Sequence, residues 1–371
     1  MTRIATFDLL RGYFLLAIVL DHLFFYPNGL DWVAMQGNLY VSAAEGFFLI
    51  SGIVLGIVRG VKLIDKPFKD AARLLLKRGL HLYVLSIILT LIFTALGWFV
   101  FNDHHGLKEG IWPFMENLPL LLWQTLTFQY DYGWADYLKL YSIFLFVSPF
   151  ALWLLRRGWW YVLLTVSIIL WLLFPNPATT PENIQHLLQP LSWQLLFFGG
   201  FTIGFYWPTI VGWWLSRTQR VRKILIGTTV TIGFGSLLAN IFIVFGAKMV
   251  IPIPADIAMQ LDDFGTLVHA QLFDKEQLPL PRVLMFMSWF MAAFWLVRKF
   301  ETVIIKYAGW LLLAFGTNSL YVYTMQAIII FFVHLFVDPG ALPFNFVVSI
   351  GVIALIRLAI HYQILMKLIP R

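Results

Sequence analysis

The chain has 371 residues, of which 60% are hydrophobic, 18% are aromatic and only 12% are charged. A soluble domain carries about 25% charged residues, so this composition excludes an ordinary soluble protein and a disordered one. The net charge of +7 does not indicate a nucleic-acid partner, because basic residues gather in cytoplasmic loops of membrane proteins and no basic-aromatic binding module is evident. The absence of cysteine excludes disulfides, thiolate metal sites and a cysteine nucleophile, and we expect no metal site.

Ten apolar segments are candidates for membrane-spanning helices, which need about 20 mostly apolar residues. We expect spans near residues 9–27, 41–58, 79–101, 138–155, 159–174, 192–215, 223–246, 283–297, 309–335 and 344–366. The first segment is interrupted by charged residues and lacks a cleavage site, so we expect a permanent span and no signal peptide. The short apolar segment at 118–129 predicts a re-entrant or interfacial piece. The predicted fold is an all-α polytopic membrane protein with a single domain over residues 1–371.

Lysine and arginine are unevenly divided between the two sides of these spans. With the N-terminus in the cytoplasm, 19 of the 26 basic residues fall on the cytoplasmic side, and the 5 outside are Lys108, Lys139, Lys248, Lys275 and Arg282. Two more, Arg11 and Arg357, lie within spans. The positive-inside rule therefore predicts that both termini are cytoplasmic.

The first span carries an unusual number of polar residues, namely Asp8, Arg11, Asp21 and His22. Arg11 and His22 are eleven positions apart, which places them within about 20° of each other around a helix and about 16 Å apart along it. Asp8 can pair with Arg11 at i, i+3. A structural Arg–Asp pair and an interhelical histidine would explain these residues without function. For His22, with Asp21 beside it, we favour a functional role, because ionisable groups inside a membrane are costly.

The second span begins close to the outer surface with Ser42 and Glu45. We expect Glu45 at about the depth of His22, where a carboxylate can hold an imidazole in one tautomer and raise its basicity. Gly52 and Gly56 form a small-x-x-x-small pair that favours close helix packing.

Basic residues also cluster at the cytoplasmic end of the third span, at Arg73, Lys77, Arg78 and His81. They could snorkel to water or bind phosphates such as those of coenzyme A. The i, i+3 spacing of Arg78 and His81 predicts that both point into the bundle. In the last span, Arg357 and His361 share a face and either extend this cationic region or form a structural pairing.

Other polar residues have simpler explanations. Trp193 and Gln194 are expected at the outer interface, where an aromatic-belt tryptophan is the favoured interpretation and stacking against a sugar is the alternative. Asn318, Ser319 and Gln326 in the ninth span are neutral groups that can hydrogen-bond across helices.

Several motifs resemble those of a known family. Arg11, ten intervening residues and His22 resemble the Arg-x10-His signature of the acyltransferase 3 superfamily of membrane acyltransferases, and FFLISG at 47–52 is similar to its Phe-Phe-x-Leu-Ser-Gly stretch. Four segments together resemble the OpgC-type family, which is associated with succinylation of periplasmic glucans in Gram-negative bacteria: FDLLRG at 7–12, AEGFF at 44–48, PLSWQLLF at 190–197 and NSLYV at 318–322. The resemblance covers residues 3 to about 335. It departs near Gln326, where many relatives would carry a histidine.

This resemblance implies ten spans in a bacterial inner membrane, an acyl-CoA donor from the cytoplasm and a glycan acceptor outside. It implies that His22 is the catalytic base and that Arg11 belongs to the donor site. Glu45 and Arg78 are carried over as the group that orients His22 and as a ligand of the donor phosphates.

The expected function is therefore that of a membrane O-acyltransferase, which transfers succinyl or acetyl from acyl-CoA to a glycan hydroxyl. Asp8 and Asp21 are further candidates for substrate contacts, together with Arg357. A transporter or flippase for a lipid-linked sugar or acyl group is the main alternative, and a scaffold of an envelope assembly is a third. The residues leave open the acyl group, the acceptor, the choice between direct transfer and an acyl-histidine, and the oligomeric state.

Overall fold

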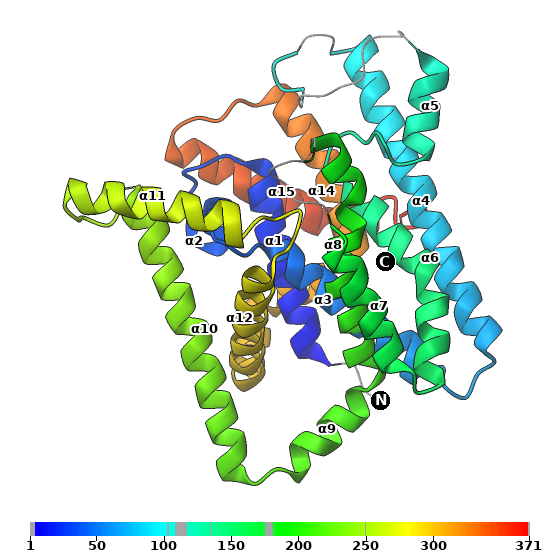
Figure 1. Ribbon diagram of the computed structural model, residues 1–371. Helices are drawn as coiled ribbons and strands as arrows, with labels where there is room; N and C mark the ends of the chain where they lie inside the picture. The colour runs from blue at the N-terminus through cyan, green and yellow to red at the C-terminus, as the bar shows by residue number, and fades with distance from the viewer. Residues whose placement is uncertain are drawn as a thin grey trace.

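A computed structural model describes residues 4–101, 104–107, 117–134, 136–174, 180, 182–248 and 250–369, and all regular elements within them are helical. Figure 1 shows their arrangement. The helices are α1 (Ala5–Leu23), α2 (Asp31–Ala34), α3 (Ala43–Leu55), α4 (Phe68–Phe99), α5 (Leu118–Leu126), α6 (Asp136–Arg156), α7 (Trp160–Leu172), α8 (Glu182–Phe205), α9 (Trp207–Ser216), α10 (Gln219–Ala247), α11 (Ala255–Leu272), α12 (Leu280–Lys299), α13 (Glu301–Thr317), α14 (Ser319–Phe336) and α15 (Leu342–His361). A short 3₁₀ turn, η1 (Met35–Gly37), follows α2, and a π-helical segment, η2 (Gly56–Val61), continues α3.

Several of these helices are suited to a lipid bilayer. Within the described residues, 7 spans are long and apolar enough to cross a membrane: α3 with η2, α4, α6, α10, α12, α14 and α15. The pair α8 and α9, bent by 66° at the break between them, raises the number to 8 if it forms one span. The protein is therefore an all-helical, multi-pass membrane protein, whereas the count of ten spans and the cytoplasmic termini stay predictions.

Two of the expected spans are broken. The segment at 309–335 was expected as one helix, but the chain leaves helical geometry at Asn318, whose amide donates to the carbonyl of Ala314 and to the hydroxyl of Thr317. Asparagine favours helix ends because its side chain competes for backbone groups in this way. The segment at 192–215 breaks at Tyr206, just before Pro208 in the first turn of α9, where a proline is best tolerated.

The two regions expected as outer loops also contain helices. The region 247–281 forms α11, which lies across the end of α10 in Figure 1. The short apolar segment at 118–129 forms α5. Neither segment has an uninterrupted apolar length of about 20 residues, and this length is the signal by which spans are recognised.

Close packing of α3 against α8 depends on glycine. A Cβ atom on Gly52 or Gly56 would collide with backbone atoms of α8, and one on Gly200 or Gly204 would collide with the backbone of α3. The packing role expected for Gly52 and Gly56 is thus confirmed. The same kind of contact brings α1 onto α13 at Gly12 and Gly316. The first span is thereby fixed against its neighbours in the centre of the molecule.

Candidate functional site

His22 lies in the last turn of α1 and is half-buried. Its Nδ1 atom is 2.8 Å from Nε2 of Gln326 on α14. The imidazole stacks on Trp134, with ring centres 4.4 Å apart and planes inclined by 18°, and the edge-on ring of Tyr323 is 6.2 Å away. The carboxyl end of a helix favours a positive charge. His22 is therefore placed where its protonated form is stabilised by the α1 dipole and by an aromatic face.

A buried ion pair holds the segment that carries Trp134. Nζ of Lys139, near the start of α6, is 2.5 Å from Asp131 and 3.3 Å from the carbonyl of Phe128. Gly133, directly before Trp134, has a φ of +84°, which a glycine adopts without strain. Lys139 was counted on the outer side of the membrane, but it is almost fully buried in the protein. It fixes residues 128–134 next to His22.

Arg11 and Asp8 form the pair that their spacing predicts. Nη2 of Arg11 is 2.9 Å from Oδ1 of Asp8, and both side chains are buried in the first half of α1. The pairing satisfies both charges inside the apolar core, which lowers the cost of placing them there.

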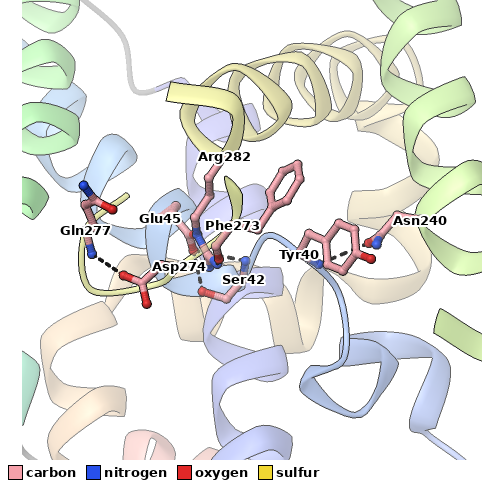
Figure 2. Close-up of polar contacts among 8 residues, drawn as sticks. All are labelled: Tyr40, Ser42, Glu45, Asn240, Phe273, Asp274, Gln277 and Arg282. Carbon is pink, nitrogen blue, oxygen red and sulfur yellow. Dashed lines mark hydrogen bonds and ion pairs between the residues drawn. The ribbon is translucent and has the colours of Figure 1, made fainter. Parts of the chain in front are cut away.

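Glu45 contacts a different residue from the one expected. Its Oε1 atom is 2.5 Å from Nη2 and 2.7 Å from Nε of Arg282, and its Oε2 atom accepts from the backbone N–H and the hydroxyl of Ser42 (Figure 2). Both carboxylate oxygens are therefore engaged by Arg282 and Ser42, and the expectation that Glu45 orients His22 stays a prediction. The two interactions instead cap the start of α3 and neutralise a guanidinium that is 2% exposed.

Arg282 also fixes the segment between α11 and α12. Its Nη1 atom donates to the carbonyl of Phe273 at 2.6 Å, and Figure 2 shows this segment turning beside Glu45 with Asp274 bonded to the N–H of Gln277. The carbonyl of Leu278 accepts from the indole of Trp171. Residues 273–282 thus connect α3, α7 and α12.

Asp21 points to another side of α1 from His22. Its Oδ1 accepts from the hydroxyl of Tyr26 at 2.9 Å, and the carboxyl lines a cavity of about 220 Å³ together with Tyr13, Trp289 and other aromatic side chains. Burial, followed by the nearby Asp21 charge, raises the pKa of the Tyr26 hydroxyl, so Tyr26 stays protonated and acts as the donor. The structure therefore does not bring Asp21 and His22 to one point, although they are adjacent in sequence.

Trp193 and Gln194 are not at an accessible surface. Trp193 is 0% exposed and packs edge-on against Phe48 and Tyr137. Gln194 is buried and exchanges two hydrogen bonds with Ser167 of α7 at 2.6 and 2.7 Å. Neither side chain is accessible to a sugar in this arrangement, and their assignment as substrate-binding residues stays a prediction without support from their burial. The apolar residues around Trp193 and Gln194 in the sequence suggested a membrane interface, but in the structure they surround the two side chains in the protein core.

The cationic residues predicted for the donor site differ in their surroundings. Arg78 is half-buried on α4. His81 does not point into the bundle, because its side chain is exposed and its Nε2 lies 2.7 Å from the carbonyl of Leu368. Arg357 donates from Nε to the carbonyl of Trp310 at 3.1 Å. Such a contact is compatible with a structural pairing, which was one of the two alternatives that the sequence left open.

Comparison with known proteins gives one result. A family model described as OpgC protein matches residues 3–367. The chain belongs to the OpgC family. No curated protein and no solved structure matches the chain. Membership of the OpgC family points to a transferase of the acyltransferase type, acting on osmoregulated periplasmic glucans.

Within this OpgC-family protein, the described groups beside the His22 imidazole include the amide of Gln326 and the rings of Trp134 and Tyr323. Sequence reasoning identified His22 but missed Trp134. It treated Gln326 as a group that bonds across helices and as the position where the family resemblance departs. Gln326 was recognisable in the sequence because it is a neutral amide within an apolar segment. Trp134 gave no comparable signal, because tryptophans are common in this chain, which has 16 of them.

Proposed function

We propose that this OpgC-family protein is an integral-membrane O-acyltransferase, which moves a succinyl or acetyl group from acyl-CoA to a hydroxyl of an extracytoplasmic glycan. The observation that carries the proposal is the environment of His22, a half-buried imidazole bonded to Gln326 and stacked on Trp134 in a protein whose family points to acyl transfer to periplasmic glucans. Imidazole titrates near neutral pH, which suits a general base.

In the proposed reaction, Nε2 of His22 takes the proton of the acceptor hydroxyl as its oxygen attacks the thioester carbonyl. The carbon–sulfur bond then breaks, and the departing thiolate takes the proton back from Nε2, so that free CoA and an ester are formed. The imidazolium exists only between these two events. The α1 carboxyl end and the face of Trp134 stabilise it during this interval.

The donor is proposed to enter from the cytoplasmic side. Arg11, paired with Asp8, lies about 16 Å from His22 along α1, and we propose that the acyl end passes this pair. Arg78 and Arg357 are the proposed contacts for the donor phosphates. The glycan is proposed to approach from the opposite side, past residues 128–134 and Asp21.

This assignment of sides rests on the charge distribution. We propose a bacterial inner-membrane location with both termini in the cytoplasm, because 19 of the 26 basic residues would then face the cytoplasm.

The test is a His22→Ala variant, purified and reconstituted in liposomes with acyl-CoA and a glucan acceptor. Release of free CoA thiol and the mass of the glucan report the transfer and identify the acyl group. We expect His22→Ala to lose at least about 100-fold in kcat, whereas the matched control His105→Ala, at an exposed surface contact with Asp338, should keep wild-type activity. Wild-type transfer by inserted His22→Ala would overturn the proposed mechanism.

A further inference from the structure

The helix α11 is amphipathic. Large apolar residues recur along it at intervals of three and four, which places them on one face of the helix. This apolar stripe consists of Ile257, Leu261, Phe264, Val268 and Leu272. The acidic residues Asp256 and Asp263 lie on the other side, and the helix contains no lysine or arginine. Such a pattern is typical of a helix that lies between an apolar medium and water.

The place of α11 relative to the membrane follows from the helix before it. The candidate span α10 has 29 residues and is therefore about 44 Å long, which matches the thickness of a bilayer with its headgroups, about 40–45 Å. The helix α11 lies across the end of α10 (Figure 1). One end of α10 is therefore at the depth of the headgroups, and α11 lies at the same depth.

The contact between the two helices shows which face of α11 is turned towards the membrane. A Cβ atom on Gly246, in the last turn of α10, would collide with the side chain of Leu261. A Cβ atom on Gly265 would come within 3.3 Å of the side chain of Ile243. The face that rests on α10 thus includes Leu261, a member of the apolar stripe, so the stripe is directed towards the bilayer and the acidic side away from it.

Contacts with the rest of the protein fix this rotation of α11. The hydroxyl of Tyr40 donates to the carbonyl of Gly265 at 3.3 Å, and its ring stacks on Phe273 with ring centres 4.7 Å apart. The backbone N–H of Tyr40 donates in turn to Oδ1 of Asn240 on α10 (Figure 2). Arg282 holds the carbonyl of Phe273. Because the middle and the end of α11 are both attached in this way, the helix is not free to turn its apolar stripe away from the membrane.

Much of the apolar stripe is not covered by protein. Ile257, Phe264 and Leu272 are 42%, 52% and 42% exposed. The last turns of α10 are also exposed, at Leu238 and Phe242, and only 17% of the apolar window of α10 is buried. The stripe therefore adjoins a helix surface that faces lipid, and the medium that covers this surface of α10 reaches the stripe as well.

We propose that α11 is an interfacial helix, whose apolar stripe binds the lipids of the adjacent leaflet at the boundary between headgroups and acyl chains. Asp256 and Asp263 then face water. In the proposed orientation of the chain, this leaflet is the outer one. The inference goes beyond acyl transfer and does not depend on it, since it uses only α10, α11 and their contacts.

The chemistry of α11 also indicates which force holds it on the membrane. Interfacial helices often bind anionic lipids through lysine and arginine, but this helix has neither and its water-facing side is acidic. Burial of the apolar stripe is therefore the attractive contribution. Through Phe273 and Arg282, the interfacial helix also fixes the level of residues 273–282 relative to the membrane surface.

The absence of cysteine allows a nitroxide to be attached at a single introduced thiol. Two pairs of sequence neighbours are used, Ile257→Cys with Asp256→Cys and Phe264→Cys with Asp263→Cys. All four positions are exposed, and the members of a pair differ in the face of α11 on which they lie. The full-length protein is reconstituted in phosphatidylcholine vesicles. Power-saturation EPR then compares collisions of the nitroxide with oxygen, which concentrates in the bilayer, and with a nickel chelate, which stays in water.

We expect a higher oxygen-to-nickel collision ratio at positions 257 and 264 than at their acidic neighbours. Leu238→Cys, at an exposed position on α10, is the reference for a lipid-facing nitroxide. Adding phosphatidylglycerol to the vesicles should leave the ratios unchanged or lower them, because the water-facing side is acidic. An increase would contradict apolar burial as the attractive force.

Two results would overturn the inference. Equal or reversed ratios within both pairs would show that α11 is surrounded by water. A nitroxide at position 264 that neither reagent reaches would show that a second copy of the chain or another protein covers the stripe. If one variant does not fold, the other pair decides. None of these measurements involves acyl transfer, so failure of the proposed function is a separate result.

Discussion

Arg282 and Glu45 form a buried ion pair whose members are 2% and 1% exposed. Removing one charge leaves the other buried without compensation, which costs about 3–5 kcal/mol. We therefore expect Glu45→Gln to lower the free energy of unfolding by about this amount, measured by denaturant titration in mixed micelles. A double variant with Arg282→Met should recover part of the loss. Wild-type stability of Glu45→Gln would show that the pair is not structural.

The contact between Trp134 and His22 leads to a second prediction at this scale. An aromatic pair contributes about 0.5–1.5 kcal/mol beyond its buried area, and here the stack also stabilises the imidazolium. Trp134→Leu should lower kcat/KM for acyl transfer by about threefold to tenfold, whereas Trp134→Phe should retain most activity. Trp123→Leu, at a largely exposed tryptophan on α5, is the matched control. Equal activity of Trp134→Leu and wild type would contradict the stacking role.

Single residues also show what the sequence could and could not predict. Arg11 and His22 were recognisable because ionisable groups stand out in an apolar segment. The partner of Glu45 was not, because Arg282 lies 237 positions away and sits at the end of a span, where a basic residue is expected to face water. The Ser42 to Glu45 spacing of a capping box was the available sign that this carboxylate had a structural role.

At the scale of elements, the contact of α3 with α8 offers a prediction with an internal control. A Cβ on Gly200 would collide with the backbone of α3, whereas one on Gly199 would meet nothing within 4 Å. Gly200→Ala forces the two helices apart and should cost about 1–3 kcal/mol, measured by the same denaturant titration. Gly199→Ala should be neutral or stabilising by up to about 1 kcal/mol, because alanine favours the helix. Equal stability of the two variants would contradict this packing.

Hydropathy predicted the positions of two helical regions, but it did not predict where the helices within them are interrupted. The spans expected at 309–335 and 192–215 each contain an interruption, at Asn318 and at Tyr206. In both cases the run of apolar residues continues across the interruption. A prediction based on the length of the apolar run therefore joins the two helices into one. The helix α11 was missed for the opposite reason, because its charged residues conceal a helix that lies across the end of α10 (Figure 1).

Over the whole molecule, two connecting segments are held in place by buried ion pairs of the same kind. Lys139 with Asp131 fixes residues 128–134, and Arg282 with Glu45 fixes residues 273–282. Both basic residues had been counted among the 5 outside. Because each is neutralised inside the fold, neither is a free loop charge, and the remaining outer lysines are Lys108, which lies outside the described residues, Lys248 and Lys275. The charge asymmetry that predicts the orientation is therefore stronger than the raw count.

This orientation can be tested through the absence of cysteine, since a single introduced thiol is then the only one in the chain. The two ends of α10 provide suitable positions. Gln219 is its first residue, and Asp256 is the second residue of α11, just beyond the other end of α10; both side chains are exposed. If the basic residues near 217–223 are held in the cytoplasm, a membrane-impermeant maleimide should label Asp256→Cys in intact cells and Gln219→Cys only after permeabilisation. The reverse pattern would place His22 at the cytoplasmic side, where an extracytoplasmic glycan could not reach it, and would refute the proposed direction of transfer.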